Sequence, residues 1–186
     1  YARTLQPGSR LNTLMENAAR QLAENEPAVA MKWFQSLPEG EGRRSFLNGM
    51  MPAMTQNNPR GAAAFVAELP AGEIQNGAAL SVVGQWVEVD PTGAAAWASG
   101  LPTAIRQQAI NTVVQRWAND DASAAGKWAE ALSDESDRQC AVMTYVQALS
   151  GQYPELAAPF VEALTDPNVR SSMIGSVAQN WLRTDP

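Results

Sequence analysis

The chain of 186 residues contains no histidine and only one cysteine, Cys140. The absence of histidine excludes nucleophiles activated by an imidazole, zinc sites that use histidine ligands and proton shuttles built on histidine. A single cysteine forms neither an internal disulfide nor an all-cysteine zinc site. Since most familiar catalytic designs need one of these, the sequence predicts no catalytic residue, no metal site and no cofactor.

Charged residues are scarce at 17% of the chain, and acidic ones are in excess, so the formal net charge is −6. Because proteins that bind nucleic acid usually carry a strong basic excess, the composition speaks against a nucleic-acid partner. Long apolar runs are missing too. No uninterrupted apolar stretch approaches the roughly 20 residues that span a bilayer, so no membrane span is expected. A chain of this length buries enough surface to hold a core without disulfides or metal.

A repeat is the main feature that the sequence does contain. A short anchor recurs every 31 or 32 residues, at Glu26-Pro27, Asn58-Pro59, Asp90-Pro91, Asp121-Ala122, Tyr153-Pro154 and Asp185-Pro186. Counted from the second anchor residue, the first five repeats have alanine at offset 3, an aromatic residue at offset 6 and leucine at offset 10. These offsets lie on one face of an α-helix. Asp or Asn caps such a helix and proline suits its first position.

A second apolar stripe follows in each repeat at offsets 20, 23, 24 and 27, one residue earlier in the third repeat. Upstream of the first anchor, Met15, Ala18, Ala19 and Leu22 fit the second helix of an incomplete leading repeat. The sequence therefore predicts an all-α fold of eleven helices, an α-solenoid (α-α superhelix) of five helical hairpins plus one leading helix. It would be a single domain over residues 1–186, with repeats at 1–25 (partial), 26–57, 58–89, 90–120, 121–152 and 153–184. A globular bundle of eleven helices is the alternative.

Residues 166–174, Asp-Pro-Asn-Val-Arg-Ser-Ser-Met-Ile, resemble the opening of the second helix in short bacterial HEAT-like repeats. Arginine recurs at the equivalent place in Arg43, Arg106, Arg138 and Arg170, and the second full repeat has Gln75 there. In length the repeats are also similar to tetratricopeptide hairpins, but they lack the Trp-x-x-Leu-Gly positions of that family. The resemblance implies a binding scaffold whose second helices line the concave side, and it implies no catalytic residue.

Two recurring residue types have both a structural and a binding interpretation. The aromatic residues are expected to fill space between adjacent hairpins, and the alternative is a platform on which bases or sugars stack. The arginines are expected to donate to the free carbonyls that end the preceding helix, or to a nearby carboxylate, and so to tie one repeat to the next. Their alternative role is to bind an anionic partner.

The second helices also share a polar face with few charges. Eight residues on it are the candidate partner-binding residues: Arg106, Gln107, Asn111, Gln115, Arg138, Gln139, Gln147 and Gln179. Gln115, Gln147 and Gln179 share one offset, so they would form a ladder in a solenoid. Uncharged amides both donate and accept hydrogen bonds and cost less to desolvate than ions, which suits recognition of a peptide backbone. The alternative is an ordinary solvated face.

The leading hypothesis is a non-enzymatic scaffold that binds a protein or peptide. One alternative is a HEAT-like repeat enzyme acting on nucleic acid, by analogy with the HEAT-repeat DNA glycosylases, and another is a structural module that assembles end to end. We also expect the chain to be a fragment of a longer array, since it opens on half a hairpin and closes on an anchor dipeptide. Otherwise its open ends would meet other chains. The identity of the partner and the cellular compartment stay open.

Overall fold

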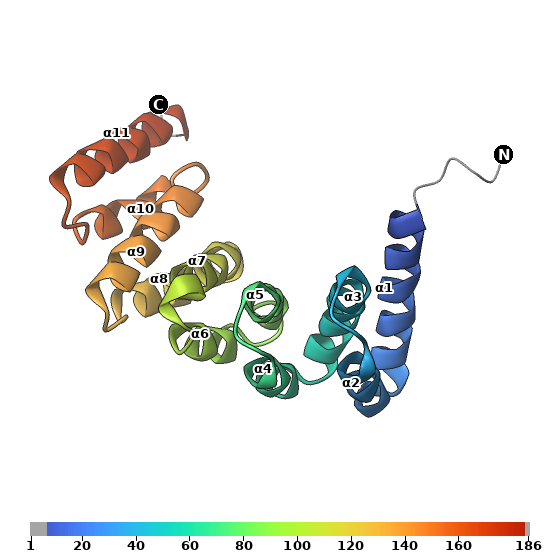
Figure 1. Ribbon diagram of the computed structural model, residues 1–186. Coiled ribbons are helices and arrows are strands. Elements are labelled where there is room, and N and C mark those ends of the chain that lie inside the picture. Colours follow the sequence, from blue (N-terminus) through green and yellow to red (C-terminus); the bar gives the residue numbers. More distant parts are fainter. Residues whose placement is uncertain (1–6, 185–186) are drawn as a thin grey trace. The chain divides into compact units, whose positions relative to one another are not determined.

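The computed structural model describes the backbone of residues 7–184 and the side chains of residues 10–183. Within that range the chain forms eleven α-helices and no strand, which confirms the predicted all-α class (Figure 1). None of the described helices combines the length and the apolar character that crossing a bilayer requires. The chain divides into two compact units, an N-terminal unit over Tyr1–Val89 and a C-terminal unit over Asp90–Pro186.

The N-terminal unit contains five helices. They are α1 (Pro7–Asn25), α2 (Pro27–Ser36), α3 (Glu41–Asn57), α4 (Pro59–Glu68) and α5 (Glu73–Trp86). The pairs α2 with α3 and α4 with α5 are in contact, as expected of hairpins, and α3 also contacts both α1 and α5. The longer helices α1, α3 and α5 thus form one row, and the short helices α2 and α4 lie on one side of it (Figure 1).

The C-terminal unit repeats this arrangement with six helices. They are α6 (Pro91–Ser99), α7 (Thr103–Asp120), α8 (Ala122–Glu130), α9 (Glu135–Leu149), α10 (Pro154–Val161) and α11 (Pro167–Thr184). Three successive pairs form hairpins, α9 contacts both α7 and α11, and the short helices α8 and α10 contact each other. Each unit therefore has a layer of long second helices and a layer of short first helices.

The predicted starts of the short helices are confirmed by their caps. The side chains of Asn58, Asp90 and Asp121 each accept a hydrogen bond from the backbone N–H three residues further on, at 2.9, 2.9 and 3.0 Å. Glu26 and Tyr153 precede α2 and α10 without such a bond. The short helices span 8 to 10 residues rather than the eleven expected, because the chain leaves the helix just before the leucine at offset 10, or one or two residues earlier.

The apolar stripes form the core. The alanine at offset 3 is buried in every repeat, and the four stripe positions of the second helix are all buried in α3, α5, α7 and α9. Small alanines at offset 3 let the short helix lie close to its neighbours. The predicted periodicity therefore identifies the core of the four repeats that precede α11.

Five predicted core positions are wrong: Ile174, Ala178 and Trp181 on α11 are exposed, and so are one residue of α2 and one of α1. Trp33 in α2 is 55% exposed, and the next residue, Phe34, is buried and meets the Phe65 ring of α4 edge-on at 5.6 Å. Helix α2 therefore turns Phe34 toward α4 in place of Trp33. In α1, Ala18 is exposed, and Ala19 and Ala23 are the buried residues, because α1 packs on α3 along a slightly different stripe.

Candidate functional site

Three of the recurring arginines, and the glutamine at the same position, bind backbone carbonyls at or just after the end of a short helix. Arg43, Arg138 and Arg170 each donate to the main-chain carbonyl of the leucine at offset 10 in their own hairpin, at 3.4, 2.8 and 2.8 Å. Gln75 donates to the Val66 carbonyl at 3.1 Å. These are the contacts expected of the structural role. They join the two helices of one hairpin rather than one repeat to the next.

Arg106 differs from the other arginines because it reaches the following hairpin. Its Nε lies 2.5 Å from Oδ2 of Asp137, at the start of α9. Asp137 is only 4% exposed, so this ion pair links α7 to α9 where little water competes. Arg138 also pairs with Glu135 within α9. A partner-binding role for Arg106 and Arg138 stays a prediction, and both guanidinium groups already have partners within the chain.

Two further candidate residues hold α7 and α9 together. Gln107 donates to the Ser136 hydroxyl at 2.8 Å. Asn111 lies 3.4 Å from the Cys140 sulfur, and its carbonyl oxygen accepts a hydrogen bond from the Thr144 hydroxyl at 3.0 Å. Part of the polar face of the C-terminal unit is therefore engaged within the chain, because these side chains contact one another between α7 and α9.

Gln139 binds a stretch of backbone. Its Nε2 donates to the Ala163 carbonyl at 2.9 Å, and its Oε1 accepts from the Thr165 N–H at 2.8 Å. Ala163 and Thr165 lie in the turn between α10 and α11. One amide side chain thus satisfies both a carbonyl and an N–H of a segment that has left the helix.

Gln115, Gln147 and Gln179 differ from these residues because all three are exposed. They lie on α7, α9 and α11 at one repeat position, and α9 is in contact with both other helices. We call these three residues the glutamine row. The structure places them on neighbouring helices with their amides in solvent.

A cleft in the C-terminal unit includes two of the candidate residues. Its volume is about 300 Å³, and it is lined by Gln107, Ser136, Gln139, Cys140, Met143, Leu164, Thr165, Asp166 and Val169. The lining combines the amides of α7 and α9 with apolar side chains from α9, from the turn after α10 and from the start of α11. Such a mixture of an apolar floor and a few polar groups is typical of a site that binds a peptide or small molecule.

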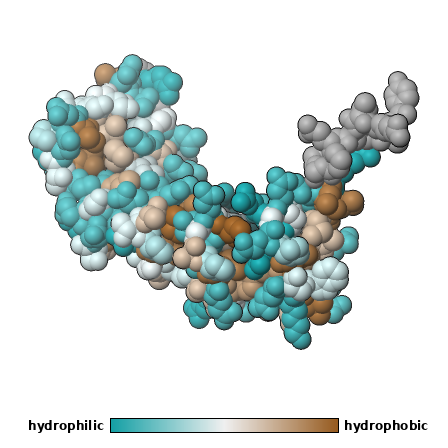
Figure 2. Space-filling model, viewed as in Figure 1, coloured by the Kyte–Doolittle hydropathy of each residue, from teal (hydrophilic) through white to brown (hydrophobic). Residues whose placement is uncertain are grey.

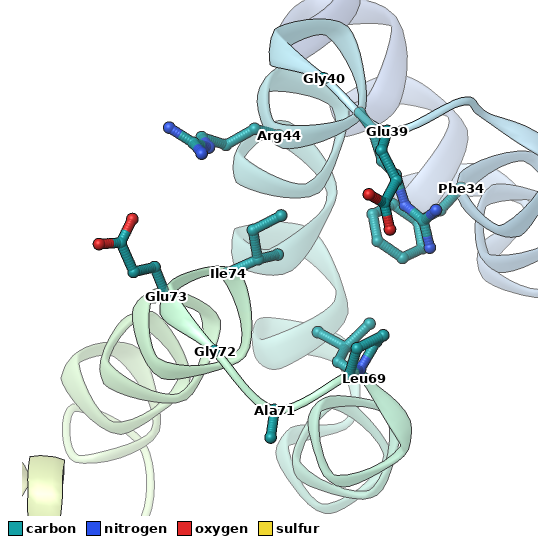
Figure 3. A pocket seen from close by; sticks show the side chains of 11 residues that line it. Phe34, Glu39, Gly40, Arg44, Leu69, Ala71, Gly72, Glu73 and Ile74 are labelled. Atoms are coloured by element: carbon teal, nitrogen blue, oxygen red, sulfur yellow. The ribbon is translucent and has the colours of Figure 1, made fainter.

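A cleft at the same repeat position occurs in the N-terminal unit, with a volume of about 410 Å³ (Figure 3). Leu69 and Ile74 occupy the places that Leu164 and Val169 have in the other cleft, and Arg44 has the offset of Gln139. Figure 3 shows Arg44 and Glu73 on one side of the opening and Glu39 on the other. A cleft therefore recurs where a second helix begins beside the turn of the following hairpin.

Two glycines shape the turns at the N-terminal cleft. Gly40 and Gly72 have φ angles of 146° and 152°, which residues with a side chain rarely adopt. Each of them directly precedes a second helix. They lie 32 residues apart, so the same strained conformation recurs in both repeats. Sequence reasoning missed the clefts, although this recurrence of glycine at offset 13 is a signal that could have marked the turns.

Among the described residues, no group of three or more Cys, Asp or Glu side chains lies close enough together to hold a metal ion. Comparisons of the chain with protein-family models, curated proteins and solved structures each find no match. The resemblance to HEAT-like and tetratricopeptide repeats therefore rests on the motif and the repeat length alone.

Proposed function

We propose that the chain is an α-solenoid of five helical hairpins and one leading helix, and that it is a non-enzymatic scaffold for an extended segment of a protein partner. The hairpin contacts and the row of second helices within each unit support this architecture. The anchors, which continue at 31 or 32 residues through the sequence that joins the two units, support its extension over the whole chain.

The glutamine row is the observation that carries the proposed function. Neighbouring packed helices lie about 8–10 Å apart, and an extended chain advances about 3.3 Å per residue. Amides at one repeat position would therefore meet an extended peptide at about every third residue. Exposed Gln115, Gln147 and Gln179 have the spacing and the chemistry for such contacts.

The contact between Gln139 and the turn 163–165 supports the chemistry. A glutamine on this layer of helices already pairs with a carbonyl and an N–H of non-helical backbone. A partner segment would offer the same two groups to the glutamine row. Because the recognising groups are uncharged, the affinity should change little with salt, whereas a nucleic-acid partner would give a steep salt dependence.

A selection of displayed random peptides against the folded chain would test this proposal. The affinity of each selected peptide would be measured for the wild type and for a variant carrying Gln115→Ala, Gln147→Ala and Gln179→Ala. Each lost hydrogen bond is worth about 0.5–1.5 kcal/mol, so we expect the affinity to fall at least about tenfold.

A matched control would carry three exposed glutamines changed outside the row: Gln35→Ala, Gln56→Ala and Gln152→Ala. We expect this control to bind like the wild type, and both variants to keep the helical circular dichroism spectrum. Equal affinities for all three proteins, or no enriched peptide, would contradict the proposal.

A further inference from the structure

Helix α11 exposes three of the four positions of the apolar stripe that the other second helices of its unit bury; Ile174, Ala178 and Trp181 are exposed, and Val177 is buried. On α9 the four stripe residues, Val142, Tyr145, Val146 and Leu149, are 0–2% exposed. At the same offsets on α11, Ile174 is 53% exposed and Trp181 is 41% exposed. Leu182, beside Trp181, is exposed as well. Figure 2 shows apolar surface near the C-terminal end of this helix.

The short helix of the following hairpin covers this stripe in the two preceding cases. Helix α8 contacts α7, and α10 contacts α9. The Trp128 ring of α8 lies 6.0 Å from the Trp117 ring of α7, and the Phe160 ring of α10 lies 4.4 Å from the Tyr145 ring of α9. Trp128 and Phe160 are both the aromatic residue at offset 6. A second helix is thus covered each time by the aromatic residue of the next short helix.

We infer that the exposed stripe of α11 is a docking face for one further helical hairpin of the same repeat. Trp181 has the repeat position of Trp117, so the occupant would place an aromatic ring near Trp181. The occupant is then a short helix with alanine three residues and an aromatic residue six residues after its first position. All five short helices of the chain carry this pattern, and the alanine of each is already buried within the chain.

A second copy of the chain fits this face less well. The exposed apolar residues of the first two helices are Leu11 and Leu14 on α1 and Trp33 on α2. The offset-3 alanine of α2, Ala30, is already buried and α2 already packs on α1, so a second copy offers an aromatic residue but no short helix with an open alanine face. This inference concerns the apolar stripe of α11 and does not depend on the peptide-binding role of the glutamine row.

Extending the chain by one repeat tests the inference. A copy of residues 155–184 is joined directly after Pro186, which keeps the 32-residue spacing of the anchors. Ile174→Cys, in a Cys140→Ser background, reports the accessibility of the stripe through its rate of reaction with a soluble thiol reagent. We expect the thiol to react at least about tenfold more slowly in the extended protein than in the 186-residue protein.

Two controls make the result specific. Gln179→Cys, on the exposed polar side of α11, should react equally fast in both proteins. An extension that carries Phe160→Asp in the copied segment should not protect the thiol, because a charged side chain cannot occupy the apolar position over α11. A second extension is a copy of residues 123–152 and contains Trp128. It tests the inference even if the copy of residues 155–184 fails to fold.

Two outcomes would overturn the inference. One is an unchanged reaction rate of Ile174→Cys with both extensions. The other is protection of Ile174→Cys in the unextended protein that grows with protein concentration, together with a doubled mass in light scattering. The second result would identify another copy of the chain as the occupant.

Discussion

The substitution Gly49→Ala tests the close contact between α1 and α3 in the N-terminal unit. An ideal Cβ at Gly49 would lie 2.1 Å from the carbonyl oxygen of Glu16 and 2.6 Å from its Cα. These are backbone atoms of α1, so no side-chain rotation relieves the overlap. Real Cβ atoms essentially never approach another heavy atom within 3.0 Å, and α1 would therefore have to move by about 0.9 Å.

Two opposing terms set the expected magnitude. Alanine in place of glycine favours a helix by about 1 kcal/mol, and overpacking costs typically about 1–3 kcal/mol or more. Because the overlap is with backbone, we expect a cost at the upper end of that range, about 3 kcal/mol, and therefore a net loss of stability of about 2 kcal/mol. Helix α1 buries only two of its described residues fully, Ala19 and Ala23, so its contact with α3 is the part of the unit that should loosen first.

Urea unfolding followed by circular dichroism would measure the loss of stability, and amide hydrogen exchange would locate it in α1. The matched control is Gly77→Ala in α5, where an added Cβ meets nothing within 4 Å. There we expect a gain of about 0.5–1 kcal/mol from helix propensity alone. If Gly49→Ala were as stable as Gly77→Ala, the close approach of α1 and α3 would be refuted.

Three further predictions concern other residues. Asp137→Ala should lower the free energy of unfolding by about 1–3 kcal/mol, because it removes the carboxylate that pairs with Arg106, and a loss below about 0.5 kcal/mol in urea titrations would contradict this. Burial, and then nearby carboxylates such as Glu130, raise the pKa of Tyr145. Stability that is present at neutral pH should therefore be lost as the pH rises past about 10, and the loss should be smaller in Tyr145→Phe. Unfolding titrations of both proteins between about pH 8 and 11 would measure the difference. Tyr153→Asp should raise the thermal midpoint by supplying about 0.5–1 kcal/mol of N-cap stabilisation to α10, and an unchanged midpoint would argue against capping there.

The roles of the polar side chains could be predicted only in part. A row of arginines at one offset indicates a repeated contact, and Arg43, Arg138 and Arg170 make the carbonyl contacts expected of them. The pairing of Arg106 with Asp137 could not be deduced, since it depends on how far α9 lies from α7. The clefts and the contact of Gln139 with the next turn could not be deduced either, because they form only where two hairpins meet.

The sequence by itself determined the helices and most of their buried faces. Anchors such as Asn58, Asp90 and Asp121 cap a helix through bonds to residues three positions away, and the apolar stripes are periodic along a single helix, so both are local properties. Only the tertiary structure decided which stripe residues are covered. Phe34 is buried and Trp33 is not, and Trp117 meets a ring of the next helix while Trp181 lies 41% exposed on α11. Burial is set by whatever packs against a face, and that neighbour lies outside the pattern of the helix itself.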